Sequence, residues 1–168
     1  MVAAGWLLLL GSAASAAEMP VRWTSGAALW STQQQAIDTF LSTGVINDRG
    51  LAAGLARSGW SAEEIRAAMN KTYSVDLVAV ARFLDSPAGR KALSDQSVVY
   101  YPFRSEGRTA MPALRSAILA AAADGRLSAA TILAHLPADM RRTPGPVMPL
   151  LTWLVFLPAH IQAGQLNP

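Results

Sequence analysis

Two histidines, His135 and His160, are the side chains of this 168-residue chain whose ordinary pKa lies closest to neutral pH. Either imidazole could serve as a general acid or base. His135 is expected at the end of a short helix, where a cationic imidazole favours the carbonyl end, so a structural role is the main interpretation. His160 has no acidic residue near it in sequence, and the spacing of both histidines with Asp139 matches no metal site. We therefore expect neither a metal nor a cofactor.

The closest approach to a serine-hydrolase motif is the string GWSAE at residues 59–63. It lacks the second glycine of the G-x-S-x-G elbow. Ser61 and Glu64 instead form the S-x-x-E pattern of a helix capping box, and Glu63 and Glu64 fit the first turn of that helix, where anions are favoured. The chain contains no cysteine, which excludes a thiolate nucleophile. The sequence therefore identifies no catalytic residue.

A stretch of β-branched and aromatic residues at positions 98–103 (VVYYPF) predicts a strand or an extended loop. It contains Tyr100, Tyr101 and Phe103, and Arg104 follows it. Loops of this composition often carry binding residues, so these four residues form a candidate recognition loop. The alternative interpretation is the packed edge of a core.

A second candidate contact surface lies near the C-terminus. Residues 144–146 (PGP) read as a linker, and residues 147–157 (VMPLLTWLVFL) are almost wholly apolar. The prolines and the short length argue against a transmembrane helix, which needs about 20 apolar residues. We call residues 147–157 the apolar tail segment. Its candidate contact residues for a partner protein, an apolar ligand or a membrane are Leu150, Leu151, Trp153, Leu154 and Phe156.

Arg141 and Arg142 precede the apolar tail segment. One interpretation places them in a solvated turn. The other makes them a basic collar at lipid headgroups, beside which Trp153 and Phe156 would insert. Both interpretations remain open from the sequence.

Residues 1–17 (MVAAGWLLLLGSAASAA) have the build of a secretory signal peptide. An apolar run from Val2 to Leu10 is followed by small residues, with Ala14-Ser15-Ala16 as an A-x-A cleavage site. No lysine or arginine precedes the run, and a buried first helix is the alternative. The prediction is export to a periplasm or lumen, with membrane association as a further option.

The net charge of +3 comes from 14 basic and 11 acidic residues. The basic residues are scattered along the chain and do not cluster with aromatic residues on one element, so we expect no nucleic-acid partner. The length after the signal peptide fits one domain. We place a helical domain at residues 18–143 and the linker with the C-terminal tail at residues 144–168.

Helix signals occur throughout residues 32–137. Polar residues that can cap a helix precede runs of apolar residues at helical spacing, and glycines follow several of these runs. Residues 20–30 alternate weakly and predict a small hairpin that leans on the helices. The expected fold is mainly α, a compact array of six or seven short helices. The expected helix starts are Thr32, Asp48, Ser61, Ser74, Ser86, Thr109 and Ser128.

Three segments together resemble a known family: AIDTFLSTGVI, SAEEIRAAMNKTYSVDLVAVARFLDSPAGRKAL and MPALRSAILAAAADGRLSAATILAHLP. The most specific parts are residues 80–89 and residues 121–128, and the resemblance covers roughly residues 21–142. The family is cyanobacterial and of unknown function. Its members carry a signal peptide and this helical region, often ahead of an α/β-hydrolase domain, and are commonly labelled α/β hydrolases. The resemblance implies that the hydrolase chemistry belongs to a region other than this helical one.

The leading functional hypothesis is an exported, noncatalytic helical module that binds a partner protein or an apolar ligand. One alternative is a hydrolase-associated domain or hydrolase subunit, as the family label implies; as an enzyme it would turn over small esters through Ser61. The other alternative is peripheral membrane attachment through the C-terminal tail.

Overall fold

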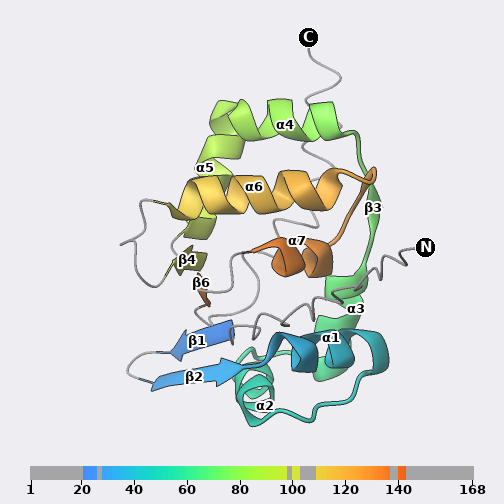
Figure 1. Ribbon diagram of the computed structural model, residues 1–168, viewed down its shortest axis with the longest axis vertical. Helices are drawn as coiled ribbons and strands as arrows, with labels where there is room; N and C mark the ends of the chain where they lie inside the picture. Colours follow the sequence, from blue (N-terminus) through green and yellow to red (C-terminus); the bar gives the residue numbers. More distant parts are fainter. Residues whose placement is uncertain (1–20, 26–27, 98–99, 103–108, 137–139, 143–168) are drawn as a thin grey trace, which may run out of the picture.

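The computed structural model describes residues 21–25, 28–97, 100–102, 109–136 and 140–142. The predicted signal peptide and the apolar tail segment lie outside these residues. Within them the chain forms seven helices and two small sheets, so the expectation of a mainly α fold is confirmed. Figure 1 shows α4, α6 and α7 stacked above one another, with β1, β2, α1 and α2 at the opposite end of the molecule.

Local capping signals set the ends of the first three helices. Asp48 accepts a hydrogen bond from the Leu51 amide at the start of α2, and Ser61 starts α3 with a complete capping box. Gly44 ends α1 with a φ of 83°, a left-handed conformation that favours glycine. The expected start at Thr32 is wrong, because Thr32 is the last residue of a strand and Gln33 occupies the N-cap. The bounds are α1 Gln34–Thr43, α2 Arg49–Ala56 and α3 Ala62–Asn70.

The starts of the next four helices agree with the predicted starts, with one exception. Ser74 does not start a helix: it lies in a short strand, and the N-cap is Asp76, whose side chain accepts from the Ala79 amide. Ser86 accepts from the Gly89 amide at the start of the next helix, as its Ser-Pro sequence predicts. Ser128 forms a second capping box with Thr131. The bounds are α4 Leu77–Asp85, α5 Pro87–Ser97, α6 Ala110–Ala122 and α7 Ala129–His135.

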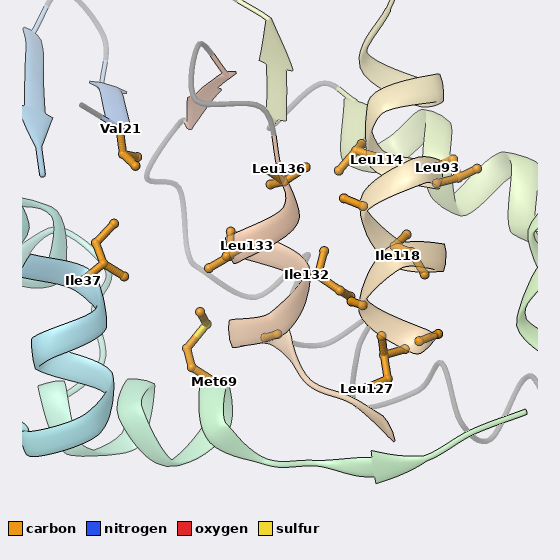
Figure 2. Packing of buried hydrophobic residues seen from close by; sticks show 14 of the residues in the cluster. Val21, Ile37, Met69, Leu93, Leu114, Ile118, Leu127, Ile132, Leu133 and Leu136 are labelled. Carbon is orange, nitrogen blue, oxygen red and sulfur yellow. The ribbon is translucent and has the colours of Figure 1, made fainter. Parts of the chain in front are cut away.

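The core forms around α6, which packs against α4, α5 and α7. Leu114 and Ile118 of α6 are each 1% exposed, and Ile132 of α7 is fully buried. Figure 2 shows α7 between α6 on one side and Met69, Ile37 and Val21 on the other. Helix α7 therefore joins the buried faces of the N-terminal and C-terminal helices into one core.

Six strands complete the described structure. The predicted hairpin is present as β1 and β2, paired antiparallel from Val21↔Thr32 to Ser25↔Ala28. It is half of a four-stranded sheet of order β2-β1-β6-β4, in which β6 pairs parallel with β1 and antiparallel with β4. A second, two-stranded sheet joins β3 to β5. The bounds are β1 Val21–Ser25, β2 Ala28–Thr32, β3 Tyr73–Ser74, β4 Tyr100–Pro102, β5 Arg126–Leu127 and β6 Met140–Arg142.

Two glycines allow close approach of the backbone. A Cβ at Gly50 of α2 would lie 2.1 Å from the carbonyl oxygen of Ser31 in β2, and a Cβ at Gly89 of α5 would lie 2.0 Å from that of Phe83 in α4. Neither distance is compatible with a side chain. Gly50 therefore fixes how α2 sits against the outer strand of the sheet.

Candidate functional site

The sheet brings together two candidate regions that lie 40 residues apart in the sequence. Strand β4 contains Tyr100 and Tyr101 of the predicted recognition loop, and β6 contains the arginine pair. The register pairs Tyr100 with Arg142 and Tyr101 with Arg141. The interpretation of Arg141 and Arg142 as a solvated turn is wrong, because both residues are paired on either side in a sheet. The strand alternative for residues 98–103 is confirmed at Tyr100–Pro102.

Strand β1 adds residues that sequence reasoning did not select. Arg22 pairs with Arg141, and Trp23 pairs with Arg142, in the parallel register between β1 and β6. The weak alternation around Arg22 indicates a strand but not its partner, because a parallel partner can lie anywhere later in the chain. The pairing therefore becomes visible only in the folded structure.

The four strands form two neighbouring cross-strand rows. One row contains Trp30, Trp23, Arg142 and Tyr100, and the other contains Ser31, Arg22, Arg141 and Tyr101. Directly paired positions share one face of a sheet, and successive positions alternate between faces.

Burial decides which row belongs to which face. Val21 and Thr32 are 3% and 1% exposed, and they share the face of Trp23 and Trp30. Leu29 is 56% exposed and Ser31 is also exposed, and they share the opposite face with Arg22. Leu29 and Ser31 therefore mark the exposed face of the hairpin, and Val21 and Thr32 mark its buried face.

Trp30 of β2 lies against the end of α2. The guanidinium carbon of Arg57, which follows α2, lies 4.9 Å from the centroid of the Trp30 ring. This distance is within the range of a cation–π interaction. The Trp30 indole nitrogen is buried and has no hydrogen-bond partner among the residues that the structure describes. A buried N–H without an acceptor costs stability.

The remaining candidates of the two contact regions lie outside the described residues. Phe103 and Arg104 follow β4 there, and the apolar tail segment follows β6. The described structure thus places Tyr100, Tyr101, Arg141 and Arg142 together in one sheet. Their relation to Phe103, Arg104 and Leu150, Leu151, Trp153, Leu154 and Phe156 stays a prediction.

Ser61 has the geometry of a helix cap. Its Oγ accepts from the Glu64 amide at 3.2 Å and donates to Glu64 Oε2 at 2.8 Å. The Glu64 carboxylate also accepts from the Ser61 amide at 2.8 Å. The hydrogen bond from the Ser61 amide, and to a smaller extent the one from the Ser61 hydroxyl, lowers the pKa of Glu64 below its ordinary value. Both groups therefore satisfy the first turn of α3.

His135 is the last residue of α7, as expected. Its Nδ1 lies 2.8 Å from the Thr131 carbonyl oxygen one turn earlier, and its side chain is exposed. His160 lies outside the described residues. Within the described ranges, no group of three or more acidic or histidine side chains is placed to hold a metal ion. In the same ranges, no helix has both the length and the apolarity that crossing a membrane requires.

Comparison with known proteins gives one match. Residues 25–141 match the model of a family described as alpha/beta hydrolase of unknown function (DUF1400). Neither the curated proteins nor the solved structures contain a match. The matched range starts in β1 and ends in β6, so it contains every described helix.

Proposed function

We propose a binding function for this chain, which belongs to the family described as alpha/beta hydrolase of unknown function. It is an exported, noncatalytic helical module that binds a partner protein or an apolar ligand. Its contact surface consists of the apolar tail segment together with strands β4 and β6, which precede that segment in the sequence. The single observation that supports this surface is the pairing of Tyr100 and Tyr101 with Arg142 and Arg141.

The composition of these strands suits an interface. Tyrosine, tryptophan and arginine are the residues most enriched among those that dominate binding energy at protein interfaces. Strands β4 and β6 contribute two tyrosines and two arginines, and β1 adds Trp23 beside them. The apolar tail segment begins five residues after Arg142. An apolar core surrounded by a polar rim is the usual anatomy of a protein contact surface.

The local chemistry of the described helices supports a noncatalytic role. Ser61 is held by Glu64 as a cap, so its hydroxyl is not presented at a strand-to-helix elbow. The described strands are two to five residues long and form a mixed sheet of four and a ribbon of two. The sheet of an α/β hydrolase instead alternates strands with helices and carries its nucleophile at a strand end.

The test is association with a partner before and after removal of the tail. The purified protein is used to capture partners from periplasmic and membrane extracts, and bound chains are identified by mass spectrometry. The identified partner is then purified and mixed with the protein in size-exclusion chromatography. Deleting residues 146–168 should abolish the complex while leaving the helical circular dichroism intact.

A control variant distinguishes binding through the tail from non-specific binding through other exposed apolar side chains. Leu77 and Val78 of α4 are 40% and 54% exposed, so they offer apolar surface elsewhere on the molecule. The variant Leu77→Ser with Val78→Ser should bind the partner as the native chain does. Binding that survives the tail deletion, or that depends equally on Leu77 and Val78, would show that the tail assignment is wrong.

The family description favours a second candidate, a hydrolase or a hydrolase subunit. This candidate predicts turnover of small esters by the purified protein and loss of turnover in Ser61→Ala. Ser128→Ala is the matched control, because Ser128 also starts a helix with a capping box. Turnover lost in Ser61→Ala and kept in Ser128→Ala would favour the enzyme over the binding module.

A further inference from the structure

Within the described residues, the four-stranded sheet has two edges of different composition. Strand β4 forms one edge; it is three residues long and contains Pro102, which lacks a backbone N–H. Short strands, prolines and charged side chains are the usual features that prevent an edge strand from pairing with another chain. Strand β2 forms the other edge, and its five-residue sequence ALWST has none of these features. The edge at β2 is therefore chemically able to accept a further strand.

The position of α2 shows which backbone groups of β2 point outward. Helix α2 lies beside β2 on the side away from β1 (Figure 1). The carbonyl oxygen of Ser31 approaches α2 so closely that a Cβ at Gly50 would lie 2.1 Å from it. The Ser31 carbonyl group therefore points away from β1. Because hydrogen-bonded and non-hydrogen-bonded pairs alternate along an antiparallel ladder, the N–H and C=O groups of Leu29 point away from β1 as well.

Leu29 is the open position of this edge. Helix α2 covers the edge at Ser31, and the ladder of the hairpin ends at the pair Ser25↔Ala28, so Leu29 lies between the two. No described residue outside the hairpin forms a backbone hydrogen bond with Leu29, and the Leu29 side chain is 56% exposed. The edge thus presents a backbone donor, a backbone acceptor and an apolar side chain at one residue.

We propose that the β2 edge at Leu29 binds an extended, uncharged peptide segment of a partner protein as an added strand. The main chain of an extended peptide supplies an acceptor for the Leu29 N–H and a donor for the Leu29 carbonyl at the spacing of neighbouring strands. Side chains of the segment on the exposed face would contact Leu29, so an apolar residue fits there. Because α2 covers Ser31, the added strand lies opposite Ala28–Trp30. The proposal does not depend on the apolar tail segment, so it can hold or fail independently of the proposed function.

The probe is a short capped peptide of alternating threonine and valine, an uncharged sequence that favours the extended conformation. It is titrated into the full chain while NMR follows the backbone amides. The largest shift changes should occur in β2, and hydrogen exchange of the Leu29 amide should slow at least tenfold in the complex, because a new hydrogen bond protects it. The control is the same peptide with its backbone amides N-methylated, which keeps the side chains and removes the donors. It should bind at least tenfold more weakly.

Two substitutions at Leu29 separate the contribution of the backbone from that of the side chain. Leu29→Pro removes the outward N–H and no hydrogen bond to β1, because that N–H points away from β1. Leu29→Val keeps the N–H and an apolar side chain. Peptide binding should fall at least tenfold in Leu29→Pro and stay within twofold in Leu29→Val. Circular dichroism checks the fold of each variant; if Leu29→Pro does not fold, Leu29→Lys replaces it, because a charged side chain on an edge strand disfavours pairing.

Three results would overturn the proposal. The first is a Leu29 amide that exchanges in the free chain as slowly as the Trp30 amide, which faces β1, because the edge would then already be covered. Fast exchange restored by deleting residues 146–168 would identify that cover as the chain's own tail. The second is the absence of peptide binding, and the third is equal binding by the N-methylated peptide or by Leu29→Pro. The same deletion separates this proposal from the proposed function, because peptide binding should survive it and partner binding through the tail should not.

Discussion

The helices α4 to α7 and the four-stranded sheet hold together in different ways. The helices follow one another in the sequence, each contacts the next, and they bury apolar side chains around α6. The sheet is built from three segments at residues 21–32, 100–102 and 140–142. Its rows contain tryptophan, tyrosine and arginine where the helices bury leucine, isoleucine and alanine.

From this difference we infer that the helices stabilise the fold, whereas the sheet contributes to the proposed binding function. We call helices α4 to α7 the helical body. Contacts between residues that are close in sequence cost little loop-closure entropy, so capping residues and apolar spacing within each segment can direct the formation of this body. The sheet depends on that body to bring its strands together. We therefore expect changes in the helical body to act on stability, and changes on the exposed face of the sheet to act mainly on binding.

The largest expected effect comes from the helical core. Leu114→Ala removes a side chain that is 1% exposed and should destabilise the protein by about 2–5 kcal/mol, because it leaves a cavity. Leu29→Ala on the exposed face of the sheet removes the same atoms from a residue that is 56% exposed and should cost within about 0.5 kcal/mol. Denaturant unfolding measures both. Similar losses for the two variants would contradict the division between body and sheet.

The second effect tests the contact between the sheet and α2. Glycine to alanine inside a helix normally stabilises by about 1 kcal/mol. At Gly50 the new Cβ would lie 2.1 Å from the Ser31 carbonyl oxygen, so Gly50→Ala should instead destabilise by about 1–3 kcal/mol. Thermal unfolding shows whether Gly50→Ala is more or less stable than the native protein. Ala52→Ser, at an exposed position of the same helix, is the control. A more stable Gly50→Ala protein would mean that α2 does not pack closely on β2.

The same comparison explains which parts of the structure the sequence could predict. Asp48, Ser61 and Ser128 act within three residues of themselves, so their helix starts could be read directly. The expected helix starts at Thr32 and Ser74 are wrong because each residue is paired in a strand instead. Thr32 pairs with Val21 of the same hairpin, and Ser74 pairs with Arg126, which is distant in sequence. The four-stranded sheet could be predicted only in part. The aromatic strand had a local signal, but the pairing of Arg22 with Arg141 joins positions more than a hundred residues apart.

A third, smaller effect compares the two capping-box serines. Replacing a serine cap by alanine typically costs about 1 kcal/mol. Ser128 is 4% exposed and hydrogen-bonds with Thr131 beside the core, whereas Ser61 is exposed and water can replace its hydroxyl. Ser128→Ala should therefore destabilise more than Ser61→Ala. Urea unfolding of the two variants measures this, and equal losses would show that burial of the cap has no influence.

The smallest effect is the pH dependence of the α3 capping box. Hydrogen bonds from the Ser61 amide and hydroxyl lower the pKa of Glu64 in the folded state, so the contribution of this carboxylate to stability is complete above its pKa in the unfolded chain. This contribution to stability should be lost as the pH falls through the lower pKa that Glu64 has in the folded state. Glu64→Gln keeps an acceptor for the Ser61 amide and removes the titration, so the difference in stability between native and variant protein should shrink in acid.

The measurement is the free energy of unfolding from neutral to acidic pH, together with the NMR titration of the Glu64 carboxyl carbon. Glu63→Gln removes a carboxylate from the same helix turn and leaves the capping box intact. It should leave the midpoint of the Glu64 titration in place, whereas Ser61→Ala should raise it, because the hydroxyl hydrogen bond to the carboxylate is lost. A midpoint that does not move in Ser61→Ala would mean that the hydroxyl does not hold the Glu64 carboxylate in solution.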